Sequence, residues 1–337
     1  MNGSARANSG HILGFDYLRV AAVFAVVWIH GSDTNPSALR LQDFCAFAVP
    51  CFILMSAYLS VESFAAKRGM ELKRFLFSRA GRLMPAYFAW SFIYLAFRFC
   101  KHRFISGTSF PVDWVSVIFF GGASYQLWFV PALFIWSVVI APLMLLTARK
   151  RWPAAAGVAM VFSGATIYII GLTVLHVVKI PAGYEMVKYL LGDTGYVFIG
   201  IGLWLLFRAV KGSEKYSERL GSNLVGMAFM GLLLVDLRLG ARRDWFTPLF
   251  SLSVFWMSLR RGDPANSLIA KYLSPCAFGI YLSHGIFVEG LQTAAGRAGI
   301  SVGSFYTTAG IILSAFVCSS ALCILLRMRK ETRWLVI

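Results

Sequence analysis

The stretch GFDYLRVAAVFAVVWIHG, residues 14–31, decides how this chain is interpreted. It is long and apolar enough to form a membrane-spanning helix, yet it contains Asp16, Arg19 and His30. A charged side chain inside hydrocarbon costs at least about 2.5–3.5 kcal/mol, so ionisable groups in such a helix usually serve a function. The eleven-residue spacing places Arg19 and His30 on nearly one helix face, about 16 Å apart along the axis.

The whole sequence has the composition of a membrane protein. Of its 337 residues, 58% are hydrophobic and only 14% are charged, which is too little charge to cover a soluble domain of this size. The net charge of +17 is spread over short segments between apolar stretches and not over one face, so it does not indicate nucleic-acid binding. Because the first apolar stretch is long enough to span and carries Arg19, we expect no cleavable signal peptide.

We predict an all-α fold, a polytopic transmembrane bundle of about ten spans that forms a single membrane-embedded domain over residues 1–337. The predicted spans are 14–31, 44–61, 81–99, 125–147, 153–176, 188–207, 221–238, 244–259, 274–293 and 304–326. Residues 112–122 are apolar but too short to cross, so a re-entrant or interfacial segment is expected there. Most of the 32 Lys and Arg residues lie on the cytoplasmic side if the N-terminus is cytoplasmic, so both termini are predicted there.

The six cysteines show no metal-ligand spacing, and the sequence predicts no metal site. We expect them to be small apolar side chains in the helices. A disulfide among Cys45, Cys51 and Cys100 is the alternative.

The ionisable residues of the first helix suit group transfer to a hydroxyl. A neutral imidazole such as that of His30 is the usual general base for a hydroxyl, with Asp16 as a further candidate catalytic residue. The guanidinium of Arg19 is planar and always charged, which suits phosphate binding. The structural alternatives are a snorkelling Arg19 and an interfacial His30. With the N-terminus inside, Arg19 lies towards the cytoplasm and His30 towards the outer side.

A second basic group lies in KRFLFSRAGRLMPAYF, residues 73–88, where the third span enters the membrane. Arg79 and Arg82 are three residues apart and therefore share a helix face. They are predicted to bind phosphate, whereas plain positive-inside signalling is the alternative. Together with Arg19 at the same cytoplasmic mouth, they would suit a nucleotide-containing cofactor.

Two further segments carry candidate site residues. In SPCAFGIYLSHGIF, residues 274–287, Tyr281 and His284 share a helix face, and the alternative for His284 is a helix–helix hydrogen bond. In YQLWFVPALFIW, residues 125–136, Gln126 and Trp128 would suit a sugar. A membrane-interface aromatic belt explains Trp128 equally well.

Five segments, in order along the chain, resemble motifs of the integral-membrane acyltransferase 3 family. They are DYLRVAAVFAVVWIH (16–30), PCFILMSAYL (50–59), RAGRLMPAYF (79–88), LWFVPALFI (127–135) and FGIYLSH (278–284). They are similar to the family's Arg and His in the first helix, its Ser-Gly-aromatic-Leu segment, its Arg-x-x-Arg followed by Pro, its Leu-Trp-Phe-x-Pro and its Tyr-Leu-x-His. Ala57 replaces the usual Gly, and Gly285 stands where Pro is common.

The resemblance implies an enzyme of the bacterial cytoplasmic membrane, an O-acyltransferase that moves acetyl from acetyl-CoA to a hydroxyl of a cell-envelope carbohydrate. The family's fused esterase-like domain is expected to be absent. The implied catalytic residues are His30, Asp16 and His284, the implied acyl-CoA-binding residues are Arg19, Arg79, Arg82 and Tyr281, and Trp128 and Gln126 would bind the acceptor.

Direct attack on the thioester and an acyl-histidine relay both remain open. The rival class is a secondary transporter with an Asp16, Arg19 and His30 relay, although no internal repeat supports it. A non-catalytic sensor that keeps the fold is the third possibility.

Overall fold

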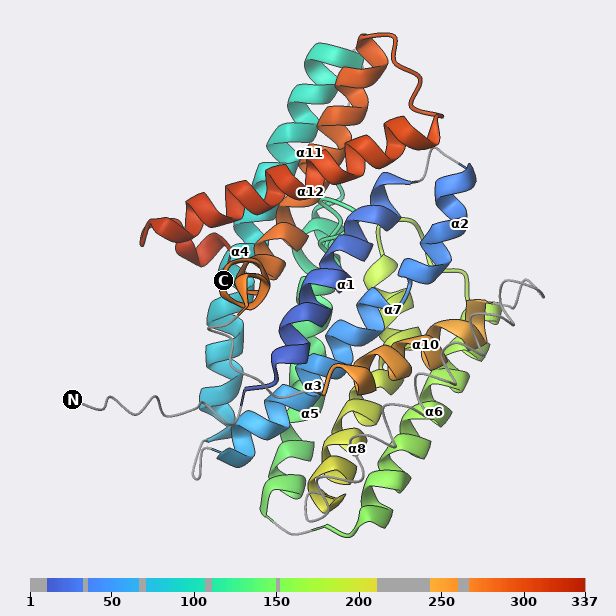
Figure 1. Ribbon diagram of the computed structural model, residues 1–337, viewed down its shortest axis with the longest axis vertical. Coiled ribbons are helices and arrows are strands. Elements are labelled where there is room, and N and C mark those ends of the chain that lie inside the picture. Colours follow the sequence, from blue (N-terminus) through green and yellow to red (C-terminus); the bar gives the residue numbers. More distant parts are fainter. Residues whose placement is uncertain are drawn as a thin grey trace. The chain divides into compact units, whose positions relative to one another are not determined.

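The computed structural model describes residues 11–32, 36–66, 71–106, 111–149, 152–210, 243–259 and 267–336. Within these ranges the chain is helical and contains no strand (Figure 1), so the all-α prediction is confirmed. The predicted span 221–238 lies outside the described residues.

The helices cover the described predicted spans, although the helix at the predicted span 81–99 begins nine residues earlier, at Leu72, and the predicted span 188–207 is divided between two helices. The helices are α1 (Leu13–Gly31), α2 (Pro36–Cys45), α3 (Ala48–Ala66), α4 (Leu72–Lys101), α5 (Phe129–Arg149), α6 (Ala154–Val177), α7 (Glu185–Asp193), α8 (Gly195–Val210), α10 (Arg243–Met257), α11 (Ala277–Arg297) and α12 (Phe305–Met328). Short helical turns are η1 (His102–Ser106), η2 (Ser116–Phe120), η4 (Ile269–Leu273), η5 (Ser274–Cys276) and η6 (Arg333–Leu335).

Seven helical segments in the described part of the chain are long and apolar enough to cross a membrane. They are Leu13–Gly31, Leu41–Ala66, Leu72–Phe104, Phe129–Thr147, Ala154–Val177, Glu185–Ala209 and Phe305–Met328. The predicted spans 244–259 and 274–293 coincide with α10, whose apolar part is short, and with α11. The protein is therefore a multi-pass membrane protein, while ten crossings and cytoplasmic termini stay predictions.

The chain divides into two compact units. The first contains α1, α2, α10, η4, η5, α11 and most of α12, and the second contains most of α3, then α4 to α8, and η6. The prediction of a single domain over the whole chain stays a prediction.

In the first unit, α1 and α11 run in the same direction. Asp16 near the start of α1 meets Ser274 just before α11, and Gly31 at the end of α1 accepts a hydrogen bond from Gln292. At Gly14 a Cβ atom would lie 2.0 Å from the backbone oxygen of Ser258, so the start of α1 approaches that segment too closely for any other residue. This packing fixes which residues of α1 and α11 face each other.

In the second unit, α6 packs on α7 and α8 through small residues. Gly157, Gly164 and Gly171 are the buried residues of α6, and a Cβ on Gly164 would lie 2.6 Å from the backbone oxygen of Gly195. Close backbone approach of this kind is how helices associate in lipid, where no hydrophobic force drives them together. The opposite side of α6 is exposed, with Phe162 69% exposed, as expected of a lipid-facing helix.

The segment 112–122 forms a short helical turn, η2, and not a crossing helix. Asp113 accepts backbone hydrogen bonds from Val115 and Ser116 at its start, and Gly121 ends it with a φ of 80°. The Tyr87 hydroxyl of α4 donates to the Val117 oxygen at 2.5 Å and so ties the turn to α4. The turn is too short to span, and its re-entrant or interfacial placement stays a prediction.

Candidate functional site

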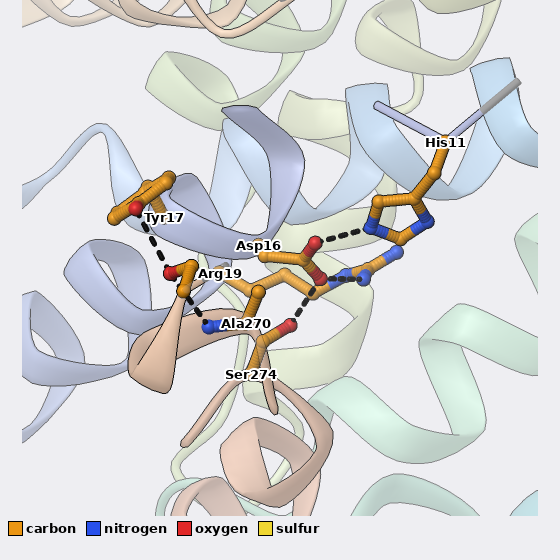
Figure 2. A network of polar contacts seen from close by, with 7 residues as sticks. His11, Asp16, Tyr17, Arg19, Ala270 and Ser274 are labelled. Atoms are coloured by element: carbon orange, nitrogen blue, oxygen red, sulfur yellow. Dashed lines mark hydrogen bonds and ion pairs between the residues drawn. The ribbon is translucent and has the colours of Figure 1, made fainter. Parts of the chain in front are cut away.

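Asp16 is the centre of a polar network at the start of α1, inside the first unit (Figure 2). The side chain is 4% exposed and accepts hydrogen bonds on both carboxylate oxygens. His11 Nε2 lies 2.5 Å from Oδ2, while Ser274 Oγ donates to Oδ1 at 2.6 Å and Arg19 Nη1 donates to Oδ1 at 3.2 Å. A buried carboxylate needs this many partners because an unpaired one is very costly to bury.

The network orients Arg19. Asp16 and Arg19 form an ion pair one helical turn apart, and the Arg19 side chain is 33% exposed. The pair uses a single nitrogen of a guanidinium that has five N–H donors, so a planar anion could still be bound by others. Asp16 lies fourteen residues, about 21 Å, from His30 along α1. Its geometry therefore suits positioning of Arg19 and not contact with His30.

The supporting residues of this network were not identified from the sequence. Ser267 Oγ lies 2.9 Å from the Tyr17 hydroxyl and accepts from the backbone N–H of Ala270. These contacts attach η4 and η5 to the start of α1. No local pattern marks Ser267 or His11, because their partners are set by how distant segments pack.

His30 and His284 meet in the same unit. Their ring centroids lie 5.5 Å apart, and the ring planes differ by 25°. His284 is 0% exposed, whereas His30, in the last turn of α1, is half-buried. The structure thus brings together two predicted catalytic histidines from opposite ends of the sequence.

The backbone fixes the tautomer of His284. Its Nδ1 lies 2.7 Å from the Tyr281 carbonyl oxygen and 3.3 Å from that of Ile280, and both oxygens can only accept, so Nδ1 carries the proton. Nε2 is then the basic nitrogen, and it is buried with no hydrogen-bond partner in the described structure. Tyr281 itself is 4% exposed, with its ring 6.0 Å from that of His284, which places its side chain beside the histidine pair.

Arg79 lies at the meeting point of three helices in the second unit. Its Nη2 donates to Ser56 Oγ of α3 at 2.5 Å, and its Nε donates to Ser137 Oγ of α5 at 3.2 Å. Among the described residues no carboxylate bonds to Arg79. Arg82 is on the same helix, and its side chain is exposed. Ser56 belongs to the second sequence motif, whereas Ser137 was missed because it lies just beyond the fourth.

Gln126 and Trp128 are buried just before and at the start of α5. Ser124 Oγ donates to Gln126 Oε1 at 2.7 Å. The Trp128 ring is 6% exposed and stacks on Tyr189 of α7, with centroids 3.8 Å apart and planes 8° apart. Tyr189 therefore covers one of the two ring faces that a sugar would need, and acceptor binding by these residues stays a prediction.

The cysteines form no disulfide, so the alternative among Cys45, Cys51 and Cys100 is not realised. In the part of the chain that the structure describes, no three His, Cys, Asp or Glu side chains gather to hold a metal ion.

The apolar helices described above define a multi-pass membrane protein that carries partly buried arginines and a pair of neighbouring histidines. A model of the acyltransferase 3 family, described as an acyltransferase domain, matches residues 12–328, and the chain belongs to this family. The chain is also 26% identical, over 230 residues, to the serine/alanine racemase of Enterococcus gallinarum. That match covers 66% of this chain and 32% of the racemase, so it spans about a third of that relative. No solved structure matches the chain.

Proposed function

We propose that this protein is an O-acyltransferase of the bacterial cytoplasmic membrane, which transfers an acyl group, acetyl by default, from acyl-CoA to a hydroxyl of a cell-envelope carbohydrate. The observation that carries the proposal is the pair of neighbouring imidazoles of His30 and His284. His30 lies at the end of α1, and Arg19 lies nearer the start of the same helix. Membership of an acyltransferase family supports the reaction class.

The arginines would bind the anionic part of the donor. Arg79 supports this best, because a partly buried guanidinium held by two neutral hydroxyls lacks a counter-charge that a phosphate would supply. Arg19 has donors beyond the one that Asp16 uses, and Arg82 is exposed beside Arg79.

His30 would act as the general base. It would take the proton of the acceptor hydroxyl, so that the oxygen forms the new ester bond to the acyl carbon. Over the whole reaction, in one step or through an acyl-enzyme, the bond from the acyl carbon to the CoA sulfur breaks and the thiolate leaves with the electron pair.

The transporter alternative finds less support. A relay from Asp16 to His30 needs further titratable groups, yet residues 20–29 of α1 are VAAVFAVVWI and all apolar. Racemisation of serine or alanine is named for a relative of which this chain matches a third, so we do not extend that activity to it.

Mass spectrometry of surface glycans tests this function in the cell. A strain that lacks the gene should lose an acetyl increment on one glycan, and a plasmid copy should restore it. A plasmid copy with His30→Gln should fail, whereas one with His176→Gln, an exposed histidine at the end of α6, should succeed. Unchanged acetylation without the gene, or rescue by His30→Gln, would contradict the proposal.

A further inference from the structure

The starting observation is the unpartnered Nε2 atom of His284. An imidazole nitrogen that is buried without a hydrogen bond loses its solvation by water and gains nothing in return. Native proteins rarely keep such an atom unless it interacts with a ligand, a water or a reacting group. The basic lone pair of His284 is therefore available to a ligand, a water or a reacting group.

His30 does not bond to this nitrogen. The two ring centroids lie 5.5 Å apart, and Nε2 of His284 has no hydrogen-bond partner in the described structure. The Nδ1 contacts of His284 are two backbone oxygens. The Nε2 lone pair therefore lies beside the His30 ring without being used by any described residue.

The fixed tautomer suits Nε2 for attack on a thioester as well as for proton transfer. Nδ1–H is held by the Tyr281 oxygen at 2.7 Å, so Nε2 presents its lone pair in one permanent direction. An acyl group on a histidine nitrogen is readily hydrolysed, and the 0% exposure of His284 would protect it from water. The half-buried His30 is the better placed of the two to meet an entering hydroxyl.

Building on the proposed function, we propose that His284 carries the acyl group covalently on Nε2, while His30 serves as the base for the acceptor. In the first step the Nε2 lone pair attacks the thioester carbon, a C–N bond forms, and the C–S bond breaks as the CoA thiolate leaves. In the second step the acceptor hydroxyl gives its proton to His30 and its oxygen bonds to the acyl carbon. The C–N bond breaks, and its electron pair returns to Nε2.

Isotope exchange without acceptor tests this division of roles. Purified protein in proteoliposomes is incubated with acetyl-CoA and labelled CoA, and labelled acetyl-CoA is measured. A covalent carrier predicts exchange in the wild type with no glycan present, because the first step is reversible. His30→Gln should keep exchange within a few-fold of wild type and lose at least about 10²-fold in transfer to glycan.

His284→Asn is the informative variant of the carrier. Its amide N–H can replace Nδ1–H in the bond to the Tyr281 oxygen, while nothing replaces Nε2. Exchange and transfer should both fall at least about 10²-fold. The yield and melting temperature of the detergent-solubilised variant should stay at wild-type levels. Exchange by the wild type tests the covalent carrier even if the variant fails to fold.

The outcomes distinguish failure of the covalent carrier from failure of the proposed acyltransferase. Transfer of acetyl to glycan by the wild type with no exchange would overturn the carrier and leave the proposed acyltransferase intact. Exchange that survives in His284→Asn, or that disappears in His30→Gln, would assign the acyl group elsewhere. Neither transfer nor exchange in the wild type would overturn both the carrier and the acyltransferase.

Discussion

Arg19 and Arg79 are both partly buried guanidinium groups in membrane-spanning helices, but the protein compensates their charges differently. Arg19 has a counter-charge inside the chain, because Asp16 accepts its hydrogen bond and is itself held by His11 and Ser274. In the part of the chain that the structure describes, Arg79 bonds only to the hydroxyls of Ser56 and Ser137. A cation without a carboxylate is expensive to bury, so its retention indicates an anionic ligand, whereas a paired cation is also explained by structure alone.

The comparison predicts that Arg79→Met separates binding from stability. The KM for acetyl-CoA should rise about 10²-fold, because charge-assisted hydrogen bonds of about 1.5–3 kcal/mol each are lost. The melting temperature should not fall, since an apolar side chain replaces a cation that no described carboxylate neutralises. Kinetics in proteoliposomes and thermal unfolding in detergent measure the two quantities.

Lys73→Met is the matched control, because Lys73 is an exposed cation on the same helix. It should change neither quantity. A lower melting temperature in Arg79→Met with unchanged KM would mean that Arg79 is structural.

Asp16→Asn should have the next largest effect and act on stability as well as binding. It leaves Arg19 without its counter-charge, so the melting temperature should fall and the KM for acetyl-CoA should rise about 10-fold. The double variant Asp16→Asn with Arg19→Gln should recover part of the lost stability, as a double-mutant cycle requires of two coupled charges. Additive losses in the cycle would contradict the pairing.

Ser56→Ala and Ser137→Ala should each raise the KM for acetyl-CoA about 3–10-fold, because each removes one of the two hydroxyls that orient Arg79. The kcat should stay within two-fold, because the proposed effect of each serine passes through Arg79 and donor binding. Ser63→Ala, at an exposed position of α3, is the control. Equal effects on kcat and KM would argue against a role through Arg79.

Ser274→Ala should have the smallest effect. It removes one of the three groups bonded to the Asp16 carboxylate and leaves the Arg19 contact in place. A loss of about 1–2 kcal/mol in unfolding free energy and a change of about two-fold in KM are expected. An unchanged KM together with an unchanged unfolding free energy would show that the bond from Ser274 to Asp16 contributes nothing.

The candidate site residues stand out in the sequence, either as exceptions to a local rule or as members of a motif. Arg19 and His30 interrupt an apolar helix, and Arg79 and His284 stand in motifs that resemble those of the family. Their partners could not be predicted in this way. Ser137 lies 58 residues from Arg79, and Ser274 lies 258 residues from Asp16, so those pairings depend on tertiary packing.

For the fold too, the positions of the helices could be predicted from the sequence, whereas their packing could not. Helix positions follow from apolar runs, and α6 begins and ends within a few residues of the predicted span. The close approach of α6 to α8 depends on which glycines face each other, and the stacking of Trp128 on Tyr189 depends on the packing of α5 against α7. No pattern within one helix contains that information.

Transfer of labelled acetyl from acetyl-CoA to envelope glycan by the purified protein in proteoliposomes tests the central claim most directly. The account predicts label in the glycan with the wild type and with His176→Gln, and a loss of at least about 10²-fold with His30→Gln. Equal labelling by the wild type and His30→Gln, in preparations of equal melting temperature, would contradict it.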